Sequence, residues 1–136
     1  MDEGQRSPRV LVVDDSRAMR ITLARLLGGL GMEVTEAGNG VEALEALATG
    51  APFDAAFIDW YMPGLNGLDL VRQVRAEPAF DPVRLVMVTS ECEAPLIASA
   101  LDAGADEYVT KPFDRVVFES KLAEMGIERR GQVPRP

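Results

Sequence analysis

Five polar or charged side chains that could take part in chemistry directly follow, or come soon after, short apolar stretches of this sequence. Asp14 and Asp15 follow RVLVV, Asp59 follows AAFI, Thr89 follows RLVMV, and Lys111 comes soon after EYV. Short and largely apolar stretches are typical of parallel strands that are buried on both faces. The carboxyl ends of such strands share one edge of the sheet, where doubly wound proteins bind their ligands. We therefore expect these five side chains to converge on one crevice.

The residue types in this crevice suit a divalent cation and a phosphoryl group. Three carboxylates close together repel one another, and a cation would relieve that repulsion. The candidate ligands are oxygens and the chain has no histidine, so the expected ion is a hard one such as Mg²⁺. A carboxylate can attack phosphorus and form an aspartyl phosphate. The Lys111 ammonium could neutralise the transferred charge, and the Thr89 hydroxyl could donate a hydrogen bond to it.

The elements that must position these residues alternate along the chain. Strands are predicted over 9–13, 34–37, 55–58, 84–88 and 107–109. Helices are predicted from the Ser16 cap to Gly31, over 40–48, 65–75 and 95–103, and from the Asp114 cap to Gly126. The expected inward faces include Val41, Leu44 and Leu47 of the second helix. Alternating strands and helices predict an α/β fold with a parallel sheet covered on both sides.

Composition excludes several classes of function. The chain has 136 residues, which suits one domain. Without histidine there can be no Ser-His-Asp or Cys-His catalysis, and with one cysteine there is no internal disulfide. A net charge of −8 argues against a nucleic-acid partner. The polar N-terminus does not resemble a signal peptide and no apolar run reaches membrane-span length, so we expect a soluble, cytoplasmic protein with no membrane contact.

Four motifs occur in order along the chain: VLVVDDS, DWYMPGLNGLDL, VMVTSE and GADEYVTKPF. Together they resemble the receiver domains of two-component response regulators, especially the stand-alone chemotaxis regulators of the CheY type. The resemblance extends from about Arg9 to Met125. It implies a doubly wound, flavodoxin-like sheet of five parallel strands in the order 2-1-3-4-5 with five helices. We expect a receiver domain over 9–126, with flexible tails at 1–8 and 127–136.

The resemblance also implies a role for each site residue. Asp59 would be the phosphoacceptor. The Mg²⁺ ligands would be Asp14 (through water), Asp15, Asp59 and the backbone carbonyl of Tyr61. Thr89 and Lys111 would bind the phosphoryl group, and the Lys111–Pro112 peptide bond would be cis. Thr89 and Tyr108 would form the switch pair.

The implied partners are proteins. The phosphoryl donor would be a histidine kinase or a phosphotransfer protein. A downstream target would read the state of the face built from the predicted helix 95–103, the strand 107–109 and the last helix. The chain would not be an enzyme, beyond weak autophosphorylation and autodephosphorylation. Tyr61 and Glu91 flank the expected path of an attacking water, so we hypothesise that they tune dephosphorylation.

Simpler interpretations exist for single residues and for the whole chain. The Asp14–Asp15 pair alone could be a strand-end turn, Lys111 alone a surface lysine, and Tyr108 a packing residue. A receiver-like interaction module that works without phosphorylation is the main alternative function. An aspartyl-phosphate hydrolase is disfavoured, because such enzymes usually carry a DxD motif after the first strand. A flavin-binding module is disfavoured because no Ser/Thr-rich phosphate loop follows that strand.

Overall fold

Five parallel strands form one sheet in the order β2-β1-β3-β4-β5. The computed structural model describes residues 7–90 and 93–127 of the chain. The strands are β1 (Arg9–Val13), β2 (Glu33–Ala37), β3 (Ala55–Asp59), β4 (Arg84–Thr89) and β5 (Glu107–Thr110). The predicted fold class and strand order are thus confirmed.

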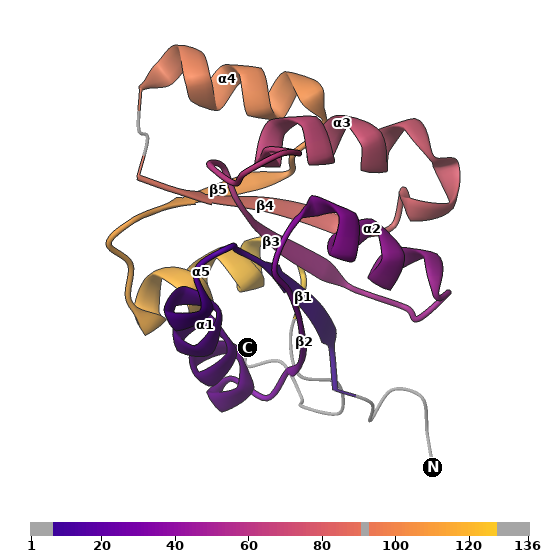
Figure 1. Ribbon diagram of the computed structural model, residues 1–136. Coiled ribbons are helices and arrows are strands. Elements are labelled where there is room, and N and C mark those ends of the chain that lie inside the picture. Colours follow the sequence, from indigo (N-terminus) through magenta and orange to yellow (C-terminus); the bar gives the residue numbers. More distant parts are fainter. Residues whose placement is uncertain (1–6, 91–92, 128–136) are drawn as a thin grey trace.

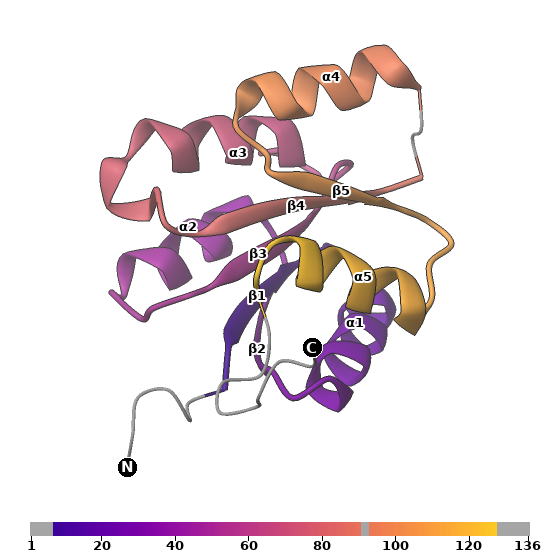
Figure 2. The same ribbon diagram turned by 180° about the vertical axis from the view of Figure 1, so that it is seen from behind.

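Helices cover both faces of this sheet. They are α1 (Arg17–Gly29), α2 (Gly40–Ala48), α3 (Gly67–Ala76), α4 (Ala94–Ala103) and α5 (Arg115–Glu124), with a short 3₁₀ turn, η2 (Pro78–Phe80). One face carries α2, α3 and α4, and the other carries α1 and α5 (Figures 1 and 2). No helix in the described chain combines the length and apolarity needed to span a membrane.

Two core layers result from alternation along the central strands. Leu11 and Val13 of β1 pack in the layer under α2, α3 and α4, while Val10 and Val12 pack in the layer under α1 and α5. All four side chains are 0–1% exposed. Burying a side chain of this kind contributes about 1.5–3 kcal/mol, so the central strands hold their carboxyl ends firmly in place.

Polar caps begin most helices just beyond the carboxyl ends of the strands. The side chains of Ser16, Asn39, Asn66 and Asp114 each accept a hydrogen bond from a backbone amide in the first turn of their helix. Such a cap contributes about 1 kcal/mol. The caps at Ser16 and Asp114 were predicted from the sequence.

Three predicted details are wrong. α3 begins at Gly67 rather than Leu65, because Asn66 caps it. Val41 does not face inward but is 60% exposed, because the buried stripe of α2 runs through Gly40, Ala43 and Leu47. Ile127, placed in the tail by the sequence, is only 8% exposed and packs in the layer under α1 and α5. Residues 91–92, which include Glu91, and 128–136 lie outside the described residues.

Candidate functional site

Three carboxylates meet at the carboxyl edge of the sheet. One oxygen from each of Asp14, Asp15 and Asp59 can be chosen so that all three lie within 4.8 Å of one another. Asp14 follows β1 directly and is 2% exposed, Asp59 ends β3 and is 9% exposed, and Asp15 is exposed. The parallel register of β1 and β3 produces this cluster, since it pairs Val13 with Ile58, the residues that precede Asp14 and Asp59.

Lys111 and Thr89 complete the edge. The Lys111 Nζ atom lies 3.2 Å from Oδ1 of Asp59 and 3.7 Å from Oδ2 of Asp14. The backbone amide of Lys111 donates to the carbonyl of Thr89 at 2.8 Å, and Thr89 itself is 1% exposed. The Lys111–Pro112 peptide bond is cis, the isomer that the resemblance implies. The structure therefore brings Lys111 to the two buried carboxylates, with Thr89 beside it in the sheet.

The electrostatics of the cluster are strained. Burial, followed by the neighbouring Asp14 charge, raises the pKa of Asp59 above its ordinary value of 3.8, although Lys111 acts in the opposite direction. Oδ1 of Asp14 accepts a hydrogen bond from the Ser16 amide at 2.8 Å. Oδ2 of Asp14 is buried and accepts no hydrogen bond from any described residue. A buried carboxylate oxygen without a donor costs free energy, so this edge has an unmet demand for positive charge.

This donor set fits Mg²⁺. Every side chain of the cluster offers carboxylate oxygens, which suit a hard divalent cation. The buried Asp14 oxygen without a hydrogen bond and the raised pKa of Asp59 both indicate that the one ammonium does not neutralise the cluster. Asp15 also lines a shallow pocket of about 510 Å³ between residues 38–42 and 63–65, which leaves its carboxylate accessible from solvent.

Arg20 of α1 supports the loop that carries the first two acids. Its Nη1 atom donates to the backbone carbonyl of Asp14 at 2.6 Å, and its Nε atom donates to Glu36 at the end of β2 at 3.3 Å. Its side chain is 19% exposed. Sequence reasoning missed this contact, because an arginine in the second turn of an amphipathic helix carries no signal that it turns back toward a strand end.

Gly67 supports the loop that carries Asp59. Its amide donates to the carbonyl of Trp60 at 2.8 Å, and a Cβ atom there would collide with the backbone carbonyl of Asp59. A glycine as the first residue of α3, where no turn requires it, was the available signal, since close backbone approach is a common reason for such a residue. It lets α3 pack directly against the end of β3.

Two further residues were predicted to belong to the site, Tyr61 and Tyr108. Tyr61 is 57% exposed, and its ring centroid is 6.5 Å from that of the buried Trp60. Tyr108 is partly buried in β5, where the Lys121 Nζ atom lies 5.2 Å from its ring centroid. Lys121 also pairs with Glu107 at 3.1 Å. In this conformation Tyr108 packs against the layer under α2, α3 and α4, with the ammonium of Lys121 from α5 beside its ring.

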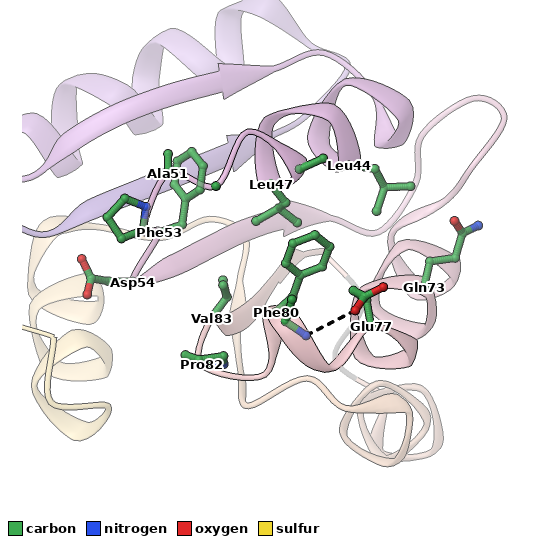
Figure 3. A pocket seen from close by; sticks show the side chains of 14 residues that line it. Leu44, Leu47, Ala51, Phe53, Asp54, Gln73, Glu77, Phe80, Pro82 and Val83 are labelled. Atoms are coloured by element: carbon green, nitrogen blue, oxygen red, sulfur yellow. Dashed lines mark hydrogen bonds between the residues drawn. The ribbon is translucent and has the colours of Figure 1, made fainter.

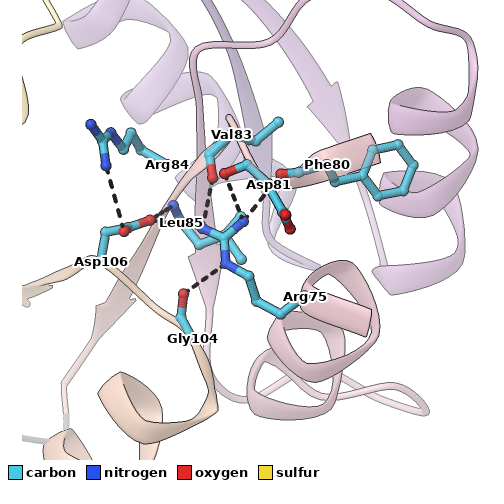
Figure 4. A network of polar contacts seen from close by, with 8 residues as sticks. All are labelled: Arg75, Phe80, Asp81, Val83, Arg84, Leu85, Gly104 and Asp106. Atoms are coloured by element: carbon cyan, nitrogen blue, oxygen red, sulfur yellow. Dashed lines mark hydrogen bonds and ion pairs between the residues drawn. The ribbon is translucent and has the colours of Figure 1, made fainter. Parts of the chain in front are cut away.

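The opposite edge of the sheet carries two features that the sequence analysis did not predict. One is a groove of about 860 Å³ between the end of α2 and η2 (Figure 3). The other is a polar network around Arg75 (Figure 4). The Arg75 guanidinium donates to the carbonyls of Gly104 (2.9 Å), Phe80 (3.1 Å) and Val83 (2.7 Å), and to Asp106 (2.8 Å). It ties α3, the start of β4 and the loop before β5 together.

Comparison with known proteins identifies the family. Residues 10–123 match the response regulator receiver domain. The chain is 44% identical over 115 residues to the chemotaxis protein CheY1 of Helicobacter pylori, covering 84% of this chain and 93% of the relative. It is 40% identical over 118 residues to the CheY homologue of Campylobacter jejuni, covering 86% and 91% of the two chains.

Solved structures agree with this assignment. The chemotaxis protein CheY4 of Vibrio cholerae superposes with a TM-score of 0.81 at 31% identity, covering 88% of this chain and 98% of that one. Receiver domains of this family are phosphoacceptor switches rather than conventional enzymes, bind Mg²⁺ at an acidic pocket, and act with histidine kinases and downstream proteins. The strand order, the acidic edge and these likenesses show that the chain belongs to the response regulator receiver domain family.

Proposed function

We propose that this protein is a chemotaxis-type or adaptor response regulator in which Asp59 accepts a phosphoryl group from a partner histidine kinase or phosphotransfer protein. The phosphorylated form then changes its affinity for a downstream protein. The observation that carries the proposal is the ammonium of Lys111, which lies 3.2 Å from Asp59 in a buried cluster that remains short of positive charge. A structural ion pair would not need two further carboxylates within 4.8 Å.

The transfer step requires little covalent chemistry from the protein. An oxygen of the Asp59 carboxylate bonds to phosphorus while the bond from phosphorus to the donor's imidazole nitrogen breaks, and its electron pair stays with that nitrogen. The Lys111 ammonium, 3.2 Å from Oδ1 of Asp59, neutralises charge on the incoming phosphoryl oxygens. The Thr89 hydroxyl donates a hydrogen bond to one of these oxygens.

The acidic residues would hold Mg²⁺. Asp15, Asp59 and the Tyr61 backbone carbonyl would be its ligands, and Asp14 would contribute through water. Bound Mg²⁺ supplies charge neutralisation for the phosphoryl oxygens. Arg20 and Gly67 hold the two loops that present these ligands. The buried Asp14 oxygen that accepts no hydrogen bond from the described residues supports this assignment.

The switch would pass from Thr89 to Tyr108 and to the face formed by α4, β5 and α5. Thr89 moves toward the phosphoryl group and Tyr108 turns inward, leaving its position beside Lys121. The helices α4 and α5 carry exposed apolar side chains, among them Leu101 (44%) and Val117 (37%), which suit a protein target. α4 is suited to movement, since only Ala100 in it is buried and Glu93 makes no side-chain cap bond.

The test uses the buried Trp60 beside the acceptor, which is 6% exposed. Purified protein receives Mg²⁺ and then acetyl phosphate or beryllofluoride, and the tryptophan fluorescence is followed. We expect a Mg²⁺-dependent change that Asp59→Asn abolishes and that the matched control Asp81→Asn, at the opposite edge, retains. If wild-type protein binds Mg²⁺ but does not respond to either reagent, a phosphorylation-independent interaction module becomes the better description.

Two further measurements address the remaining alternatives. Steady turnover of a phosphate monoester would indicate an aspartyl-phosphate hydrolase, and we expect none.

We also propose that Tyr61, which is 57% exposed, and Glu91 tune loss of the phosphoryl group. Tyr61→Asn should speed autodephosphorylation, because a smaller side chain opens the approach of water, and an unchanged or slower rate would contradict this role.

A further inference from the structure

The groove of about 860 Å³ lies at the edge of the sheet opposite the carboxylates. Its walls come from the end of α2, the segment before β3, and the segment between α3 and β4 (Figure 3). Leu44, Leu47, Phe53, Phe80 and Val83 make its floor and sides apolar. None of these walls belongs to the proposed phosphorylation site or to the face formed by α4, β5 and α5.

The groove is preformed. The side of the groove that contains Phe80 and Val83 is held by the Arg75 guanidinium, which donates to their backbone carbonyls at 3.1 and 2.7 Å. The opposite side includes Leu47 and Phe53, which are 5% and 7% exposed and anchored in the core. Binding to a site that needs no rearrangement carries a smaller free-energy cost, so even a short segment can occupy it.

The charges around the groove select a basic occupant. Asp54 lies at one end, and Glu77 with Gln73 lies at the other (Figure 3). No lysine or arginine is among the described residues that line it. The fitting ligand is therefore an extended segment with apolar side chains for the floor and positive charges for the two ends.

We propose that this groove binds residues 128–136 of the same chain. This segment, ERRGQVPRP, contains three arginines, one glutamate, one valine and two prolines. Arg129 and Arg130 would reach the carboxylate at one groove end and Arg135 the one at the other, while Val133 and Pro134 would cover the apolar floor between them. Proline favours the extended backbone that a narrow groove accepts.

The segment starts close enough to reach the groove. Ile127 packs in the core layer that includes Val10 and Ala55, near the starts of β1 and β3. Asp54, at the groove end, directly precedes Ala55 and accepts a hydrogen bond from the Arg9 amide at 2.8 Å. Nine extended residues reach about 30 Å. This is about three times the width of a helix packed on a sheet, which is about 10 Å. Attachment at Ile127 also gives the segment a high effective concentration.

The experiment compares the full chain with a version that ends at Ile127. NMR signals of Phe53, Phe80 and Val83 should differ between the two, while those of Asp15 and Thr89 should not. A fluorescent peptide of sequence ERRGQVPRP added to the shortened chain should bind and restore the full-chain shifts. Glu77→Lys should weaken this binding about fivefold, the scale of one exposed ion pair.

Matched variants separate docking from general charge effects. Glu45→Lys makes the same charge change on an exposed position of α2 that does not line the groove, and it should leave binding within about twofold. A peptide with its arginines replaced by glutamate should bind Glu77→Lys better than wild type. Identical groove signals in both chains, or peptide binding that Glu45→Lys weakens as much as Glu77→Lys, would overturn the proposal.

Discussion

The two edges of the sheet satisfy the hydrogen-bonding needs of their carboxylates to opposite extents. At the edge where strands begin, Oδ2 of Asp106 accepts hydrogen bonds from the Leu85 amide and from Arg75, both at 2.8 Å, and Oδ1 lies 3.8 Å from Arg84 (Figure 4). At the edge where strands end, Oδ2 of Asp14 accepts none from the described residues, and the pKa of Asp59 is raised.

This difference separates a structural carboxylate from a functional one. Asp106 has its donors within the fold, so its charge stabilises the connection between α3, β4 and β5. The acidic cluster contains a buried carboxylate oxygen that accepts no hydrogen bond from the described residues. This lowers the stability of the metal-free fold and leaves ligands for a cation. Acidic composition alone does not distinguish the two; the count of donors does.

The largest effect is expected from Arg75→Met. Removing the guanidinium takes one hydrogen-bond donor from each of the carbonyls of Phe80, Val83 and Gly104 and from Oδ2 of Asp106, so the free energy of unfolding should fall by about 3 kcal/mol. Denaturant unfolding measures this, and Mg²⁺ affinity of the folded protein should stay unchanged. Arg72→Met is the control on the same helix: its ion pair with Asp69 is exposed, and its loss should cost under about 0.5 kcal/mol.

The next effect has the opposite sign. Asp59→Asn removes a buried charge that Asp14 repels, so the metal-free protein should become more stable, by less than Arg75→Met destabilises it. The variant loses the ion pair with Lys111, which limits the gain. Asp106→Asn, measured in parallel, should lower stability. Destabilisation by both substitutions would remove the contrast between the two edges.

The pH dependence of that gain follows from the direction of the Asp59 shift. A raised folded-state pKa means that the native protein holds this proton more tightly than the unfolded chain. The contribution of Asp59 to stability is therefore most favourable below its ordinary value of 3.8 and declines as pH rises through the raised value. With a chelator present, the advantage of Asp59→Asn over wild type should grow across this window and then level off. A constant difference would contradict the shift.

The smallest effect is expected within the Arg75 network itself. Arg84 lies 3.8 Å from Asp106 and its side chain is 53% exposed. Arg84→Met should therefore change the free energy of unfolding by less than about 0.5 kcal/mol, because solvent screens the pair. A loss comparable to that of Arg75→Met would mean that net charge around Asp106, rather than satisfied hydrogen bonds, stabilises this edge.

The sequence by itself determined the α/β fold and the placement of the five candidate site residues at one edge of the sheet. These residues are Asp14, Asp15, Asp59, Thr89 and Lys111. Short apolar stretches, polar caps and the residue that follows each strand are local patterns, and a parallel register necessarily brings strand ends together. Element boundaries were less accurate. The inward face of α2 at Val41 and the burial of Ile127 depended on which neighbours cover a side chain, which local periodicity does not encode.

Only the tertiary structure decided which polar groups satisfy one another. Arg20 reaches the carbonyl of Asp14 and the side chain of Glu36, and Arg75 reaches Asp106, 31 positions away in sequence. Gly67 matters because the backbone of Asp59 passes against it. Arginine side chains are long and flexible, so their partners are set by the packing of distant elements rather than by their neighbours in the chain. For the same reason, the missing donor at Asp14 became visible only once the donors around it were placed.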